Sequence, residues 1–313
     1  MDLKLLTDSI KEKCLEVGFS KAGIAPVKYY ESDTEVLNKW LDKGYNASML
    51  WMEKNTDKRS NVLNYYSESK SVISVALNYF MGSSTDNHPP PYISNYALGE
   101  DYHFVIKSKL KKLLNKIRQL DKSINGYYCV DTSPIMEKAW AQRAGLGRIG
   151  KHTNLITKEF GSWVFLGELI INKELVYDSS FDTDLCGTCT LCIDNCPTDA
   201  IVEPYILDAN KCISYMTIEH REDFSDDVID LNNWIFGCDI CQEVCPWNVR
   251  FEKPSEVKEF FDKHMIQNKS YEDWESLTEE EFRIIFKDSA VKRTKYKGLV
   301  RNIQTSVKQK ETK

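Results

Sequence analysis

The feature that most constrains this chain is a run of four cysteines within residues 186–197, CGTCTLCIDNCP. The cysteines are separated by two, two and three residues, and a proline follows the last one. Bacterial ferredoxins hold iron–sulfur clusters with this spacing. The chain has 313 residues, many more than a ferredoxin needs. The run therefore predicts a cluster domain joined to a larger fold.

A second group, CDICQEVCP at residues 238–246, repeats the last two spacings of the first group. Ile235 stands where its leading cysteine would be, and Cys212 is the candidate that replaces it, which gives eight ligands. In two-cluster ferredoxins the last cysteine of each run ligates the other cluster. We therefore assign one [4Fe–4S] cluster to Cys186, Cys189, Cys192 and Cys245, and the other to Cys196, Cys212, Cys238 and Cys241.

The alternative metal is zinc, because CxxC pairs also build zinc ribbons. The repeated CxxxCP ending favours clusters. Cys14 and Cys129 fall on an apolar helix face and in a strand pattern, so we expect both to be core residues. The charged N-terminus does not resemble a secretory signal. We therefore expect the chain in the reducing cytoplasm, where ten cysteines indicate metal ligands rather than disulfides. No apolar run is long enough to span a membrane.

Hydrophobic periodicity predicts an α/β (α+β) fold. Apolar residues at helical spacing indicate helices, and short apolar runs indicate strands. The predicted helices cover 3–17, 101–120, 136–144 and a segment after the capping box at 278–281. The predicted strands cover 21–27, 71–79, 127–131 and 163–171. We expect an α/β domain over residues 1–175, a ferredoxin-like domain over 176–250 and a helical basic segment over 251–313.

The net charge of −6 conceals a basic C-terminal segment. Residues 287–313 contain nine Lys or Arg and two acids, a net +7. A local basic patch of this kind is typical of a protein that contacts a phosphate backbone. Elsewhere, the glycine-rich stretch AGLGRIGKHT at 144–153 is either a turn or a place of close approach to a large cofactor.

Several ordered motifs together resemble the epoxyqueuosine reductase family, in a form without C-terminal helical repeats. They are the cysteine groups, DKRSNVLNYYSESKSVISVALNY at 57–79, YALGEDYH at 96–103, VDTSPIMEKAWAQRAGLGRIGKHTNLI at 130–156, CISYMTIEHR at 212–221 and FKDSAVKRTKYKGLVRN at 286–302. The resemblance implies a cobalamin- and iron–sulfur-dependent enzyme that removes the epoxide oxygen of epoxyqueuosine at the wobble position of tRNA. This reduction consumes two electrons and two protons.

Asp131 resembles the family's proton donor. For a carboxylic acid to serve near neutral pH, we expect burial to raise its pKa. The alternative is that Asp131 caps the helix that follows TSP. His103 in Asp101-Tyr-His103 resembles part of a cobalt-binding Asp-x-His-x-x-Gly motif, but the glycine is missing, and we do not expect His103 to ligate cobalt.

The resemblance also implies contacts to cobalamin and to tRNA. Polar residues in the matching motifs that we expect to line the corrin are Arg59, Tyr96, Asn154, Ser214 and Asp239, besides Asp131. Residues that we expect to contact tRNA are His220, Arg221, Lys292, Arg293, Lys295, Lys297 and Arg301. The alternative for both sets is ordinary surface polarity.

The expected partners are tRNA and an external low-potential electron donor, and the expected state is a monomer without membrane attachment. Three other functions stay open on sequence grounds. These are a corrinoid reductive dehalogenase, which is usually exported behind a twin-arginine signal, an electron carrier without its own substrate, and a tRNA-binding module without catalysis.

Overall fold

The computed structural model describes residues 2–86, 88–225 and 227–312. Its α-helices are α1 (Leu3–Glu16), α2 (Glu31–Asp42), α3 (Thr56–Ser60), α4 (Val62–Tyr65), α5 (Tyr102–Leu120), α6 (Glu137–Arg143), α7 (Leu191–Asp194), α8 (Ile213–Ile218), α9 (Ile240–Glu243), α10 (Pro246–Arg250), α11 (Tyr271–Glu275), α12 (Glu279–Ile285) and α13 (Lys295–Glu311). Its strands are β1 (Lys21–Pro26), β2 (Ser71–Asn78), β3 (Tyr92–Ile93), β4 (Gly126–Cys129), β5 (Arg148–Ile149), β6 (Leu155–Ile156), β7 (Val164–Ile171), β8 (Ile201–Glu203), β9 (Ile206–Leu207) and β10 (Trp234–Phe236). Short 3-10 helices cover Leu50–Met52, Asn95–Ala97, Ala209–Lys211, Lys258–Phe260, Ile266–Asn268 and Ala290–Thr294.

A four-stranded antiparallel sheet in the order β1-β2-β7-β4 forms the centre of the N-terminal half. Every residue of β2 is buried, because helices cover both faces of the sheet and β2 is an inner strand. In the register, Glu168 of β7 lies opposite Ser74 of β2 and Cys129 of β4. An ionisable side chain is thereby placed in the middle of the sheet.

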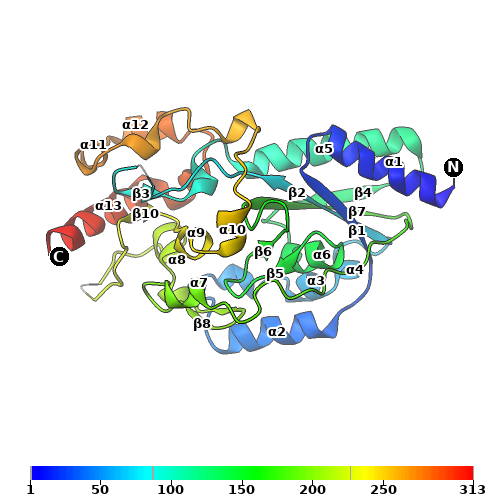
Figure 1. Ribbon diagram of the computed structural model, residues 1–313, viewed down its shortest axis with the longest axis horizontal. Coiled ribbons are helices and arrows are strands. Elements are labelled where there is room, and N and C mark those ends of the chain that lie inside the picture. The colour runs from blue at the N-terminus through cyan, green and yellow to red at the C-terminus, as the bar shows by residue number, and fades with distance from the viewer. Residues whose placement is uncertain (1, 87, 226, 313) are drawn as a thin grey trace.

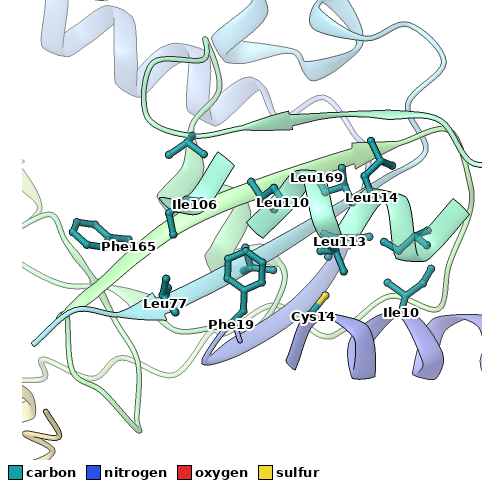
Figure 2. Close-up of a cluster of buried hydrophobic side chains, with 14 of the residues drawn as sticks. Ile10, Cys14, Phe19, Leu77, Ile106, Leu110, Leu113, Leu114, Phe165 and Leu169 are labelled. Atoms are coloured by element: carbon teal, nitrogen blue, oxygen red, sulfur yellow. The ribbon is translucent and has the colours of Figure 1, made fainter. Parts of the chain in front are cut away.

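Helices α1 and α5 cover one face of this sheet (Figure 1). Their apolar stripes pack with the sheet into the largest core cluster, which includes Ile10, Ile106, Leu110 and Leu169 (Figure 2). The opposite face packs against α6, where Trp140 and Ala141 are buried with Cys129. Cys14 and Cys129 are both fully buried free thiols, as expected for core residues.

A separate core holds the C-terminal segment in place. Its aromatic members Trp274, Phe282 and Phe286 pack with Leu299 and Ile303 of α13. The short strand β3 pairs in parallel with β10, which joins a segment of the N-terminal half to this C-terminal core. Helix α12 begins at a capping box in which Thr278 and Glu281 bond each other's backbone, as the sequence predicted.

The cysteine-rich segment carries α7 to α10 and lies between the sheet and the C-terminal helices (Figure 1). All the helices and strands expected from periodicity are present, with ends that differ by a few residues. The α/β (α+β) fold prediction is confirmed, with the sheet antiparallel. No helix among the described residues is long and apolar enough to cross a lipid bilayer.

Candidate functional site

The seven cysteines of the two groups and Cys212 were assigned to two clusters, and their thiols influence one another's pKa. Burial raises the pKa of Cys192 to about 11, and the next contributions come from the thiols of Cys186, Cys245 and Cys189. Burial also raises the pKa of Cys241 well above its ordinary value, and the next contributions come from the thiols of Cys212 and Cys196. Cys238 likewise lies near Cys241 and Cys212. In these electrostatic contributions the last cysteine of each run acts on a thiol of the other run, and the assignment of the eight cysteines to two clusters stays a prediction.

The loop that carries Cys186 and Cys189 is held by polar contacts from two sides. The Asp184 carboxylate accepts the backbone N–H groups of Cys186 at 2.9 Å and Gly187 at 3.2 Å. The Lys151 ammonium donates to the carbonyls of Gly187 and Cys189, both at 2.8 Å, and Lys151 is only 9% exposed. Among the residues that the structure describes, no three His, Cys, Asp or Glu side chains are placed to bind a single metal ion.

The glycine-rich stretch that carries Lys151 forms the β5–β6 hairpin. A Cβ atom at Gly147 would lie 2.2 Å from the carbonyl oxygen of Ile156, so glycine is required by the hairpin itself. The stretch therefore forms a turn in the structure, and close approach to a large cofactor stays a prediction. The structure adds that the hairpin anchors the first cysteine loop, which sequence reasoning missed because a lysine bonded to distant carbonyls leaves no local pattern.

Asp131 follows β4 and has a left-handed backbone, with φ of 41°. It does not cap the next helix, because α6 begins at Glu137 behind Met136, which makes no side-chain cap. The Asp131 side chain is 55% exposed, and its Oδ2 lies 3.0 Å from Nε2 of His103. Nδ1 of His103 lies 2.6 Å from Oδ1 of Asp101. Asp131 is therefore not a helix cap. It belongs to a hydrogen-bonded array of Asp101, His103 and Asp131.

The expectation of a raised pKa for Asp131 is wrong. Desolvation raises the pKa of Asp131, but the hydrogen bond and positive charge of His103 outweigh it, so the pKa lies below its ordinary value. Burial lowers the pKa of His103, yet the bonds to Asp101 and Asp131 raise it to about 9. The group that holds a proton at neutral pH is therefore the imidazole, with ionised Asp131 beside it.

Two further carboxyl groups lie beneath Asp131. Glu137 of α6 accepts the backbone N–H of Asp131. Glu168 of β7 is fully buried, and neither of its oxygens has a hydrogen-bond partner among the described residues. Burial, followed by the charge of Glu137, raises the pKa of Glu168 well above its ordinary value. Burial and the neighbouring acid therefore favour the protonated, neutral form of Glu168.

Of the residues predicted to line a corrin, Arg59 and Tyr96 lie near Asp131. Desolvation lowers the pKa of Arg59, and the negative charges of Asp131 and Glu137 oppose this change. Desolvation, and then the charges of Asp131 and Asp239, raise the pKa of Tyr96 well above its ordinary value. The Arg59 Nε is buried and finds no partner in the described part of the chain.

The other three predicted corrin contacts lie apart from Arg59 and Tyr96 along the chain. Asn154 lies in the β5–β6 hairpin, and its backbone N–H donates to His152 Nδ1 at 3.1 Å. Ser214 lies in α8, two residues after Cys212. The buried carboxylate of Asp239 accepts bonds from Ser84, Ser94 and Asn95, so its oxygens are engaged within the protein.

The predicted tRNA contacts come together where α8 meets the start of α13, and most of them bond other protein groups. The Arg293 guanidinium makes two bonds of 2.8 Å to Glu219. Arg301 donates to the carbonyls of Met216, His220 and Glu222. Arg221 donates to the carbonyls of Ile218 and Arg293, and Lys292 donates to the carbonyl of Lys287. Lys297 pairs with Asp223 at 3.1 Å, and the His220 ring stacks on Phe224. Lys295 is exposed.

Comparison with known proteins agrees with this geometry. Residues 185–248 match the family model described as a 4Fe-4S double cluster binding domain, and residues 59–132 match that of epoxyqueuosine reductase QueG, DUF1730. The first match spans all eight assigned cysteines, and the second spans Arg59, His103 and Asp131. The fold and site therefore define an iron–sulfur oxidoreductase in which a double-cluster domain adjoins a separate acid–base site.

A relative named epoxyqueuosine reductase, from Cyclobacterium marinum, is 45% identical over 299 residues, which cover 95% of each chain. A crystal structure of epoxyqueuosine reductase with an epoxyqueuosine-modified tRNA-Tyr stem loop superposes with a TM-score of 0.89 at 28% identity, covering 98% of this chain and 82% of that one. The chain belongs to the epoxyqueuosine reductase family. A catabolic reductive dehalogenase shares the fold more distantly, with a TM-score of 0.50 and 15% identity over 83% of this chain and 33% of that one.

Proposed function

We propose that this chain reduces epoxyqueuosine to queuosine in tRNA. The observation that carries the proposal is the full-length relationship to the family, combined with an exposed carboxylate, Asp131, in a site close to the cysteine sets. Asp131 and Asp239 both raise the pKa of Tyr96, so both carboxylates lie near its hydroxyl group. In the sequence, Asp239 stands between the ligand candidates Cys238 and Cys241. The relative bound to a modified tRNA stem loop supports tRNA as the substrate.

The donor groups suit the expected cofactors. Two sets of four thiols suit two [4Fe–4S] clusters, which transfer single electrons. Cobalamin carries many amide groups, and the buried Arg59 Nε and Ser60 Oγ have no partner among the described residues, so both can bond such a ligand. Arg59, Tyr96, Asn154 and Ser214 would hold cobalamin. When bound, cobalamin supplies a strongly reducing and nucleophilic cobalt.

The protein's own part in the reaction is to deliver protons and to orient the base. Removal of an epoxide oxygen as water requires two protons, and Asp131 is the exposed acid–base group of the site. Tyr96 and Arg59 flank Asp131 and help to define the space in which the modified base is received. Asp131 therefore acts at the departing oxygen.

The tRNA contacts are proposed to be a surface made by α8 and the start of α13. Arg293 and Arg221 lie near Glu219, and Lys295 is exposed. Because Arg301 bonds three carbonyls of the protein, its role there is to hold the surface together. We also propose that an external low-potential donor supplies the electrons. The protein is proposed to be a monomer, since one chain supplies all eight thiols. Its proposed location is the cytoplasm, where tRNA and reduced thiols are found.

The test is an anaerobic assay of the cluster-reconstituted protein with cobalamin, a low-potential reductant and tRNA that contains epoxyqueuosine. Nucleosides are read by mass spectrometry. We expect conversion to queuosine that requires both cobalamin and clusters. Asp131→Asn should retain iron, cobalamin and tRNA binding but lose turnover. Absence of conversion by the fully loaded wild-type protein with intact tRNA would contradict the proposed function, and wild-type turnover by Asp131→Asn would remove Asp131 from it.

A further inference from the structure

His103 is held between two carboxylates by both of its ring nitrogens. Nδ1 lies 2.6 Å from Oδ1 of Asp101, and Nε2 lies 3.0 Å from Oδ2 of Asp131. A neutral imidazole has one donor and one acceptor nitrogen. With both carboxylates ionised, both ring nitrogens must donate, so the ring is an imidazolium. The same geometry also allows one other arrangement, in which Asp131 carries the proton and donates it to Nε2.

The array is rigid at its inner end and open at its outer end. Asp101 is the N-cap of α5 and also accepts the backbone N–H of His103 at 3.0 Å. The His103 ring stacks on Tyr102 at 4.2 Å, and Tyr102 stacks on Phe165 of β7 at 4.3 Å. The His103 side chain is 21% exposed, whereas that of Asp131 is 55% exposed. Asp131 therefore faces outward, and His103 lies behind it.

The charged surroundings keep the proton on the array. Asp101 and Asp131 face His103 directly, and they raise its pKa to about 9 against the lowering effect of burial. The ionisable groups that act on Asp131 besides His103 are Tyr102, Lys138, Arg59, Arg293, Tyr96 and Glu137. Below about pH 9 the array thus holds one proton that can move between His103 and Asp131.

We propose that Asp101, His103 and Asp131 form a proton relay in which the proton held by His103 passes through Asp131 to the departing epoxide oxygen. The inference rests on the proposed function. The Nε2–H bond of His103 breaks as its proton moves to the ionised Asp131 carboxylate, and the O–H bond formed there breaks in turn as the new O–H bond forms on the substrate oxygen, which leaves Asp131 ionised again. His103 becomes neutral while Asp101 keeps its Nδ1–H in place, and solvent then restores the imidazolium. Each passage supplies one of the two protons, and the electrons come from the reductant of the proposed reaction.

His103 acts through Asp131 and is therefore a positioning and proton-storing residue, not one that contacts the substrate. This role gives His103, two residues after Asp101 at the start of α5, a function that does not require the glycine of a cobalt-binding motif. The structural alternative is that His103 only fixes the orientation of Asp131. The two roles differ in the pH dependence of the reaction, because an amide can orient Asp131 but cannot carry a proton.

The relay is tested by single-turnover rates of queuosine formation as a function of pH. For the wild type we expect a rate that falls as the pH rises through about 9. His103→Gln can still donate one hydrogen bond to Asp131, but it should lose about 10- to 100-fold in rate and the fall near pH 9, within the range that general acids contribute. Asp101→Asn should shift this fall to lower pH. His264→Gln, an exposed histidine outside the site, is the matched control and should leave both unchanged.

A second measurement does not depend on turnover. Nuclear magnetic resonance of ring-labelled histidine, in the protein without substrate, should show one signal that titrates near pH 9, disappears in His103→Gln and moves toward ordinary values in Asp131→Asn. An unchanged rate and pH profile in His103→Gln, or a His103 signal with an ordinary midpoint, would overturn the relay. If the wild type makes no queuosine, the proposed function fails, and the titration still decides whether the array holds the proton.

Discussion

The buried carboxyl of Glu168 gives the sharpest quantitative prediction. Glu168 is fully buried in the middle strand β7, and neither of its oxygens has a partner among the described residues. Burial, and then the charge of Glu137, raise its pKa well above the ordinary 4.5. The folded protein therefore binds a proton that the unfolded chain releases. Stability must fall as pH rises from 4.5 toward the raised pKa of the folded state, because the unfolded chain binds fewer protons there.

The size of the effect follows from the difference in protonation. Keeping a carboxyl neutral costs about 1.4 kcal/mol for each pH unit between its ordinary pKa and the raised pKa of the folded state. Glu168→Gln retains the shape of the protonated acid and removes this cost. A buried amide without a partner carries a penalty of its own of about 1–3 kcal/mol, which does not depend on pH. The diagnostic quantity is therefore the slope, and not the absolute gain.

We expect the unfolding free energy of Glu168→Gln relative to wild type to increase by about 1.4 kcal/mol per pH unit above about pH 5, until the raised pKa of the folded state is reached. The assay is anaerobic urea unfolding of both proteins at several pH values without cobalamin, with Glu12→Gln as the control for loss of one exposed charge. Infrared spectroscopy should show protonated-carboxyl absorption in the wild type that weakens in the Gln variant, where Glu137, whose pKa burial raises to about 8, still contributes. A difference in stability that stays flat with pH would refute the assignment of a neutral Glu168.

Three other changes test separate parts of the structure. Cys212→Ala should remove the fourth ligand of one cluster and lower the bound iron by up to half, whereas Cys14→Ala should leave iron unchanged; full iron content in the first variant would show that Cys212 is not a ligand. Gly23→Ala should lower stability by about 1–3 kcal/mol or more, measured by thermal unfolding, because its Cβ would lie 1.9 Å from the carbonyl oxygen of Ala144. Arg301→Met should reduce thermal stability as well as tRNA affinity, since its guanidinium holds three protein carbonyls; a loss of affinity at unchanged stability would instead favour direct contact with phosphate.

Much of the fold could be predicted because periodicity is a local property. The helices that begin at Leu3, Tyr102 and Glu137 follow from apolar spacing, and the capping box marks the start of α12. The sheet order β1-β2-β7-β4 could not be predicted, because pairing depends on contacts between residues that are far apart in the chain. For the same reason the pairing of β3 with β10 leaves no local pattern from which it could be predicted.

The sequence by itself determined the metal chemistry and the family. Cysteine spacing is set by the shape of a cluster, so the ligand pattern is written along the chain and can be read without coordinates. Only the tertiary structure decided the state of the acid–base site. From sequence, Asp131 was expected to be an acid with a raised pKa, whereas the fold brings His103, 28 residues away, within 3.0 Å of its carboxylate. Protonation depends on charges and burial in space, and these arise only when α5, β4 and β7 pack together.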